Sequence, residues 1–338
     1  MITLGIETSC DETSVSVSSG YRVLSNVISS SVHLHKKYGG VVPEIASRYH
    51  VEYIIEVLDR ALQGSGKSLE DIDLISVTNG PGLVGALLIG VSLAKSLSLS
   101  LDIPLIGVNH ILAHLYSSLI SGSPSFPFIG LVVSGGHTTI FYCEDLDKYK
   151  LLGQTQDDAV GEAFDKVAKI LGLGYPGGPA IEKRARAAKR TNKIVFPKSY
   201  LGEGSLDFSY SGIKTSVLNF VRAAERRAGE AGKLDDDLID DIACSFQEAA
   251  LDVLVDKALL AVKKKGLRRL VVGGGVAING RLREKCEAAC KKAGIDLYFP
   301  DRLYCTDNAA MVGVLGEAMY KKGDRADLSL KADPNLDI

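Results

Sequence analysis

The sequence lacks the features that mark several large classes of protein. None of its six cysteines forms a CxxC pair, so neither a disulfide framework nor a zinc knuckle is indicated. A net charge of -2 offers no bulk attraction for nucleic acid, and such a partner would need a local basic patch. No basic leader precedes an apolar run, and we expect no stretch long enough to span a membrane. A soluble, cytoplasmic protein with reduced thiols is predicted.

The composition is that of a globular protein. The chain has 338 residues, of which 46% are hydrophobic and 24% are charged. These values allow a sizeable core in one large domain or in two domains of ordinary size. No low-complexity linker separates the halves, so we expect the lobes to abut closely.

A strand, a small polar turn and a second strand occur twice. The first set begins with Ile2 to Glu7 and turns at 8–13, and the second begins with Phe128 to Val133 and turns at 134–138. This repetition predicts a duplicated α/β lobe whose two turns face each other across a cleft. Backbone N–H groups of such turns can bind an anion.

A third apolar run, Arg269 to Val272, ends in three glycines and leads into a helix near Ala277. A strand that passes through glycines into a helix is a phosphate-loop signal. The glycines would let a flat ring lie against backbone, with Asn279 hydrogen-bonding a sugar or base. The spacing matches neither GxGxxG nor Walker A, so it does not predict NAD or a standard kinase site.

The rest of the chain alternates short strands with helices. The helix at 83–99 is rich in leucine and alanine, and we expect it to be buried. Further strands are predicted at 74–77, 105–108 and 297–299, and helices after Pro43, after Asn109, and at 161–171, 179–189, 211–227, 238–265, 280–292 and 307–321.

His110 and His114 are four residues apart at the start of a helix, so both imidazoles lie on one face and suit one metal ion. Residue 111 is isoleucine, so the HExxH protease motif is absent. Asp307 is a candidate third ligand. The alternatives are that one histidine caps its helix while the other is a surface residue, and that Asp307 is an ordinary N-cap.

Polar residues and glycines in three other segments are candidates for binding a phosphate and a ribose. The turn Ser134 to Thr138 can hold a phosphate, Asp165 a ribose diol, and Gly178 allows close approach with Glu182 one turn further on. The alternatives are a plain hairpin turn, surface charges and a Pro/Gly loop.

Adjacent acids and two basic runs complete the candidates. Asp11 and Glu12 can accept a proton or organise water, or they are simply exposed acids. The basic runs lie within 183–198 and at 263–265 with Arg268 and Arg269. Such runs are usually solvated helix faces, but they are also the obvious places for a phosphate backbone to dock.

Taken together, these motifs resemble the tRNA N6-adenosine threonylcarbamoyltransferases, a universal family formerly described as O-sialoglycoprotein endopeptidases. The resemblance covers essentially the whole chain. Its motifs follow the family's order: Gly5–Thr13, Tyr38–His50, Lys95–Leu115, Ser134–Thr138, Gly161–Lys166, Tyr175–Pro179, Gly273–Asn279 and Cys305–Asn308.

The resemblance implies a duplicated actin-like, Hsp70-type ATPase fold with two lobes around a central cleft. We expect an N-terminal lobe at 1–108, with the segment from about 323 to 338 packing back on it. The second lobe, 109–322, would carry a helical insertion and the metal and nucleotide site. One divalent ion, iron or zinc, is implied on His110, His114 and Asp307.

An adenylate-type ligand is also implied, either threonylcarbamoyl-AMP or ATP, ADP or AMP. Position 182 is glutamate where many bacterial relatives carry aspartate, and His137 is typical of bacterial or organellar members. The residues implied to contact the ligand are Ser134, Gly135, Gly136, His137, Thr138, Asp165, Gly178, Glu182 and Asn279.

The implied reaction transfers threonylcarbamoyl from its adenylate to N6 of adenosine 37, in tRNAs that read codons beginning with A. It forms t6A and releases AMP, with Asp11 or Glu12 as candidate proton acceptor. The implied partners are tRNA, a paralogous non-catalytic chain, a small P-loop ATPase and an upstream threonylcarbamoyl-AMP synthase, without a membrane. The residues leave open a metal-dependent peptidase, an ATPase or kinase of the same fold, and a non-enzymatic scaffold.

Overall fold

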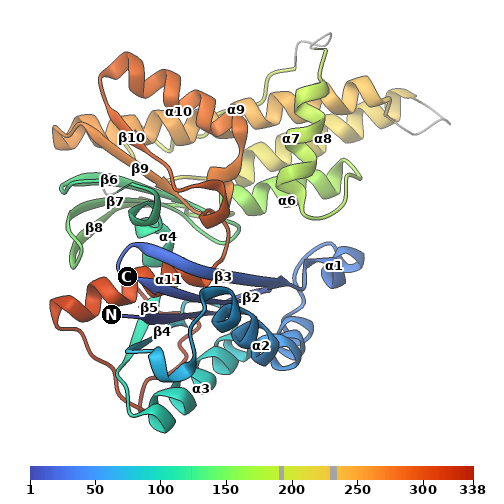
Figure 1. Ribbon diagram of the computed structural model, residues 1–338. Helices are drawn as coiled ribbons and strands as arrows, with labels where there is room; N and C mark the ends of the chain where they lie inside the picture. The colour runs from blue at the N-terminus through green and yellow to red at the C-terminus, as the bar shows by residue number, and fades with distance from the viewer. Residues whose placement is uncertain (123, 190–193, 229–233) are drawn as a thin grey trace. The chain divides into compact units, whose positions relative to one another are not determined.

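The computed structural model describes residues 1–338 except 123, 190–193 and 229–233. Two compact units share the chain. Unit 1 comprises residues 1–125, 145–148 and 299–338, and unit 2 comprises residues 126–144 and 149–298. Each unit contains a five-stranded mixed sheet with helices (Figure 1).

Unit 1 has the strand order β3-β2-β1-β4-β5. β1 pairs antiparallel with β2 and parallel with β4. The strands are β1 Thr3–Glu7, β2 Glu12–Ser19, β3 Arg22–Ser30, β4 Leu74–Gly80 and β5 Leu105–Asn109. The helices are α1 Val32–His35, η1 Lys36–Tyr38, α2 Pro43–Ser65, η2 Leu69–Asp71, α3 Val84–Leu101, α4 His110–Tyr116, α5 Ser118–Ser121, η5 Arg302–Tyr304 and α11 Ala309–Lys322.

Unit 2 has the strand order β10-β9-β6-β7-β8, which is the arrangement of unit 1 read from the opposite edge of the sheet. β6 pairs antiparallel with β7 and parallel with β9, as β1 does with β2 and β4. The strands are β6 Phe128–Val133, β7 Thr138–Asp145, β8 Lys148–Gln154, β9 Arg269–Gly273 and β10 Asp296–Tyr298. The helices are α6 Val160–Ile170, α7 Gly177–Ala187, α8 Ser211–Ala228, α9 Asp236–Lys265, η4 Gly275–Ile278 and α10 Gly280–Ala293. The predicted duplication is therefore present.

The two faces of β1 determine what surrounds its end. Side chains alternate along a strand, so Leu4 and Ile6 lie on one face, in the apolar core with residues of α2 and α3. The other face lies against α11, where Thr3 donates a hydrogen bond to Glu317 and a Cβ at Gly5 would clash with the helix backbone. Glu7, at the end of β1, is on this second face.

The division of the chain differs from the predicted boundaries after residues 108 and 322. Helix α4 continues directly from β5, and α11 packs against β1, β2 and β4, so both helices belong to unit 1. The C-terminal segment also lies on unit 1, where Asp333 N donates to Asn79 O and Ala326 N donates to Leu105 O. All three candidate metal ligands therefore lie in one unit.

Helix α3 contradicts two predictions: that no stretch of the chain is long enough to span a membrane, and that the apolar helix at 83–99 is buried. Among the described residues, α3 is long and apolar enough to cross a membrane by length and composition, although we expected no such stretch. Only one face is buried, including Leu87 and Val91, whereas Val84 and Leu88 are exposed. The buried face packs against β4 and α2, as in a core helix.

Most predicted elements are present within a few residues of their expected bounds, and Phe128–Val133 matches at both ends. Strands β3 and β8 and the short helix α1 were not predicted. β3 is only partly buried, and β8 lacks clean alternation of apolar and polar residues, so neither gives the usual strand signal. All six cysteines are described, and disulfide bonds are absent among them: each is a free cysteine.

Candidate functional site

The histidine pair stands at the first turn of α4. Asn109 caps this helix, because its side-chain oxygen accepts hydrogen bonds from the backbone N–H groups of Ile111 (2.9 Å) and Leu112 (3.2 Å). The cap therefore leaves both imidazoles available. The rings of His110 and His114 lie with their centroids 4.7 Å apart, as helical spacing predicts.

Asp307 lies just before α11 and faces the two histidines. Asn308, not Asp307, is the N-cap of α11: its Oδ1 accepts from the backbone N–H of Met311 at 3.0 Å. Asp307 Oδ1 lies 2.9 Å from His114 Nε2 and 3.7 Å from His110 Nε2. Both Nε2 atoms thus converge on one carboxylate.

Glu7 is a buried carboxylate that the sequence reasoning did not single out. Its Oε2 lies 3.1 Å from His110 Nδ1 and accepts a hydrogen bond from Thr78 Oγ1 at 2.6 Å. Its Oε1 accepts from the backbone N–H of Ser9 at 2.5 Å. When Nδ1–H of His110 donates to Glu7, Nε2 is the ring nitrogen that can bind a metal ion beside Asp307. The signal in the sequence was an acidic residue at the end of the first predicted strand, Ile2 to Glu7, directly before the small polar turn.

Opposite charges bind Glu7 and His110 to each other. Burial alone would lower the pKa of His110, but the carboxylates of Glu7 and Asp307 outweigh burial and raise that pKa to about 9. Burial would likewise raise the pKa of Glu7, and the charge and hydrogen bond of His110 hold it below its usual value. Glu7 and His110 therefore attract each other as an ion pair at neutral pH, and a metal ion that binds Nε2 of His110 would displace the proton from that nitrogen.

His110, His114 and Asp307 form a group able to hold a metal ion. One ligand atom from each residue lies within 4.8 Å of the others. Both histidines are buried, and among the described residues His114 Nδ1 has no hydrogen-bond partner. Two imidazoles and one carboxylate are a common three-ligand set that leaves coordination positions open. The alternative of a surface histidine does not match this burial.

The acidic turn after β1 is held by its neighbours. Ser30 Oγ donates a hydrogen bond to Glu12 Oε1 at 3.1 Å. Burial, and then the charge of Asp11, raise the pKa of Glu12 well above its usual value. Burial and the same carboxylates also raise the pKa of Cys10, so its thiol stays protonated and is not an activated nucleophile.

His50, from α2, fixes the backbone of this turn. Its side chain is fully buried, with Nε2 2.9 Å from Cys10 O and Nδ1 2.7 Å from Thr13 Oγ1. A ring that donates to the carbonyl through Nε2–H accepts the threonine hydroxyl at Nδ1. Burial lowers the pKa of His50 and favours this neutral form.

In unit 2, the turn Ser134–Thr138 joins β6 to β7. Ser134 N donates to His137 O at 2.8 Å, and His137 N donates to Ser134 Oγ at 3.1 Å. The first residues of α6 pack against this turn, since Gly161 N donates a hydrogen bond to Ser134 O at 3.2 Å. A Cβ at Gly161 would lie 2.6 Å from that oxygen, so close packing requires glycine there.

Helix α7 connects the other candidate residues of unit 2. Asp165 Oδ1 accepts a hydrogen bond from Gly177 N at 2.7 Å, next to Gly178. One turn later, Glu182 accepts from the backbone N–H of Gly280 at 3.0 Å, next to Asn279. The sequence-predicted residues therefore form a connected series around α6, α7 and the start of α10.

Two of these side chains are engaged within the protein. Asn279 caps α10 through Leu282 N and donates to Gln247 Oε1 at 3.0 Å, so its predicted contact with a base competes with structural bonds. Glu182 also pairs with Arg186. By contrast, space is open above Gly135, Gly136, Gly178 and Gly275, where a side chain would meet nothing within 4 Å. Open backbone at several turns suits a ligand that lies against main chain.

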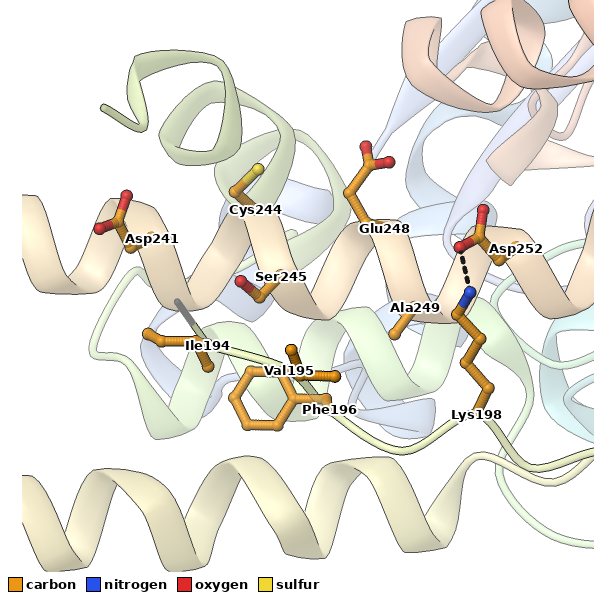
Figure 2. Close-up of a pocket in the computed structure, with 10 residues that line it drawn as sticks. All are labelled: Ile194, Val195, Phe196, Lys198, Asp241, Cys244, Ser245, Glu248, Ala249 and Asp252. Atoms are coloured by element: carbon orange, nitrogen blue, oxygen red, sulfur yellow. Dashed lines mark ion pairs between the residues drawn. The ribbon is translucent and has the colours of Figure 1, made fainter. Parts of the chain in front are cut away.

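A cavity of about 320 Å³ in unit 2 lies on α9 and contains none of the predicted site residues (Figure 2). It is bordered by the segment 194–198, and Lys198 pairs with Asp252 across it at 2.7 Å. Its other acidic groups include Glu248, which pairs with Arg281 and Lys285. These groups satisfy one another.

The first basic run, within 183–198, is largely neutralised by acids of α9. Arg184 pairs with Asp236 and Asp240, and Lys189 pairs with Asp237. Arg190 and Lys193 lie outside the described residues. In the second run, Lys265 lies over the ring of Tyr142. Fewer cations of these runs are available for phosphate than the sequence indicated.

Similar solved structures define the class. Full-length HypF, in a phosphate- and nucleotide-bound form, matches 96% of this chain and 47% of its own with a TM-score of 0.62 and 16% identity. The activator of 2-hydroxyisocaproyl-CoA dehydratase from Clostridium difficile matches 97% of this chain and 100% of its own, with a TM-score of 0.54 and 15% identity. The duplicated sheets and these neighbours place the chain among α/β proteins of the actin-like ATPase fold.

Sequence comparisons define the family. A family model described as tRNA N6-adenosine threonylcarbamoyltransferase matches residues 22–314. Relatives of that name from Dictyoglomus turgidum and Clostridioides difficile are 51% and 50% identical, over 99% and 100% of this chain and 98% of each relative. The chain belongs to the tRNA N6-adenosine threonylcarbamoyltransferase family and is a transferase. Neither peptidase nor kinase activity, the alternatives left open by the sequence, is favoured.

Proposed function

We propose that this chain transfers a threonylcarbamoyl group from threonylcarbamoyl-AMP to N6 of adenosine 37 in tRNAs reading codons that begin with A. The product is t6A and AMP is released. The observation that carries the proposal is the convergence of His110 Nε2 and His114 Nε2 on Asp307 in a chain of this family. His110, His114 and Asp307 would hold an iron or zinc ion, and an ion held there would supply positive charge to neutralise the leaving phosphate and the threonyl carboxylate.

The adenylate binds on unit 2. The turn formed by Ser134, Gly135, Gly136, His137 and Thr138 receives the phosphate on the backbone N–H groups of its two glycines, because space is open above both of them. Asp165, Gly178, Glu182 and Asn279 surround the nucleoside, from the connected series around α7.

The chemical step needs a base. N6 of the adenosine attacks the carbonyl carbon, the new C–N bond forms, the bond from that carbon to the phosphate oxygen breaks, and N6 loses a proton. Glu12 accepts this proton, because burial raises its pKa and a carboxylate with a higher pKa is a stronger base. Ser30 orients it through Oε1. The weak nucleophile makes orientation of both substrates essential.

Transfer of labelled threonylcarbamoyl to unmodified tRNA in a single turnover tests this function. The wild-type chain, with its partner proteins present, should form labelled tRNA and AMP. Glu12→Gln should lower the rate about a hundredfold or more, because general base catalysis contributes on that scale. Asp11→Asn is the matched variant and should cost less. Absence of labelled tRNA with the wild type refutes the function, and full activity of Glu12→Gln refutes the base.

A paralogous non-catalytic chain is the proposed direct partner, together with a small P-loop ATPase and an upstream synthase in the cytoplasm. Supporting this, α2 and α3 pack side by side and expose apolar side chains on unit 1. These are Val51, Ile55, Val84 and Leu88, each at least half exposed. Contiguous exposed apolar groups mark protein interfaces.

Ile55→Asp should abolish co-elution of the purified chain with that paralogue in size-exclusion chromatography, because it places a charge in an apolar contact. Val195→Asp, at an exposed apolar residue of unit 2, is the control and should co-elute normally. Unchanged co-elution of Ile55→Asp would remove this face from the interface.

A further inference from the structure

A protruding turn after β3 combines basic and aromatic side chains. It comprises His33–Tyr38, in α1 and η1, and we name it the basic aromatic turn. Lys36, Lys37 and Tyr38 are all exposed, Tyr38 by 51%. Lys37 Nζ lies 4.9 Å from the centre of the Tyr38 ring. Figure 1 shows the turn beyond the ends of β2 and β3 in unit 1.

The lysines of this turn differ from the cations of the first basic run, within 183–198. Arg184 and Lys189 pair with acids of α9, whereas Lys36 and Lys37 form no ion pair within the part of the chain that the structure describes. A phosphate can bind a lysine of this kind without displacing an acidic partner. The chain as a whole has a net charge of only -2, so binding of a nucleic acid depends on such local charge. This surface therefore offers the local positive charge that a nucleic-acid partner needs.

The turn is anchored to the acidic turn through a buried histidine. Val42 N donates to His35 Nδ1 at 3.3 Å, so the proton of His35 is on Nε2, which lies 3.0 Å from Ser31 Oγ. Ser31 Oγ in turn donates to Asp11 O at 2.9 Å, and so does Ser31 N. Burial lowers the pKa of His35 and keeps this neutral arrangement.

The same junction reaches the proposed base. Ser30, the last residue of β3, binds the carboxylate of Glu12, and Ser31 binds the backbone of Asp11. Ser30 and Ser31 therefore connect the basic aromatic turn to the segment that carries the proton acceptor. This placement suits the part of the substrate that surrounds the reacting base.

We propose that the basic aromatic turn is a docking surface for the single-stranded anticodon loop of the tRNA substrate. Tyr38 stacks on an unpaired base, and Lys36 and Lys37 contact phosphates. Unpaired RNA loops are recognised by aromatic stacking and by cations that follow the backbone. The assignment rests on the proposed function, because it takes tRNA as the substrate.

Equilibrium binding of unmodified tRNA, and of an isolated anticodon stem-loop, to the full-length chain with its partner proteins tests this surface. Tyr38→Ala should weaken both affinities about tenfold, whereas Tyr38→Phe should retain them, since stacking needs only the ring. Lys36→Ala with Lys37→Ala should reduce the steepness of log K against log salt by about 1.4, since each phosphate contact to a single strand contributes about 0.7. Affinity for AMP should be unchanged in all three variants.

Tyr21→Ala with Arg22→Ala is the matched control. This aromatic–basic pair lies at the other end of β3, and Tyr21 is 50% exposed. The control should bind both RNAs like the wild type. Wild-type affinity in Tyr38→Ala and in the double lysine variant, or an equal loss in the control, overturns the docking surface while the wild type still modifies tRNA. Failure of the wild type to transfer the label would instead refute the function.

Discussion

Asp307→Ala is expected to abolish stoichiometric metal binding and to lower the single-turnover transfer rate by about a thousandfold or more. Asp307 Oδ1 is the atom on which both histidine Nε2 atoms converge, so only two protein ligands would remain. Electrostatic help from a bound ion amounts to several kcal/mol, and each 1.36 kcal/mol is tenfold in rate. Elemental analysis of the purified protein and the transfer assay measure the two effects.

Asp301→Ala is the matched control, because Asp301 is an exposed acid in the same loop and is not among the group of candidate ligands. It should retain metal and activity. Asp307→Ala should also keep α11 folded, since Asn308 caps that helix. If Asp307→Ala bound metal at the wild-type ratio and transferred at the wild-type rate, the metal role of the group would be rejected. The same elemental analysis of the wild type distinguishes iron from zinc.

Glu7→Gln is expected to weaken metal binding by about 10- to 100-fold, although Glu7 itself is not a ligand. Carboxylates that accept the second N–H of a metal-bound histidine commonly have effects of this size. Glu7 accepts hydrogen bonds from Ser9 N and Thr78 Oγ1 and faces His110 Nδ1, so an amide NH₂ would oppose one of these donors. The loss of negative charge also makes the imidazole of His110 a weaker ligand.

Competition with a chromogenic chelator measures the affinity, and the visible spectrum of the Co²⁺-substituted protein reports the ligand geometry independently of activity. Thr78→Val is the control: it removes one hydrogen bond to Glu7 and leaves the charge, so its effect should be only a few-fold. A purely structural role for Glu7 would lower thermal stability in the variant while affinity and Co²⁺ spectrum stayed as in the wild type. That result would contradict the positioning of His110 by Glu7.

Local patterns sufficed to predict many elements. The strand Phe128–Val133 is a continuous apolar run followed by a Ser-Gly-Gly turn, and its bounds agree with the structure. The spacing of His110 and His114 placed both rings on one helix face, because helical geometry is fixed over four residues. β3 was missed because its partly buried residues carry no clear period.

The sequence left open which residue caps α11 and whether the first basic run is available to phosphate, and contacts between distant residues resolved both questions. Thr306, Asp307 and Asn308 precede a helix, and any of the three can serve as an N-cap. In the structure Asn308 bonds to Met311 N, which leaves Asp307 beside the histidines. The basic run within 183–198 likewise looked available for phosphate until α9 supplied its acidic partners.

The sequence by itself determined the fold class, the histidine pair and the family, since each rests on short motifs and their order. Tertiary structure alone decided that α11 covers the sheet of unit 1, that Asp307 meets His114 across 193 residues of chain, and that Glu7 binds His110. Helical periodicity shows that a face is buried but not which sheet buries it. Contacts between distant residues depend on packing, and Gly5 and Gly313 allow the close approach of β1 and α11 that brings this group together.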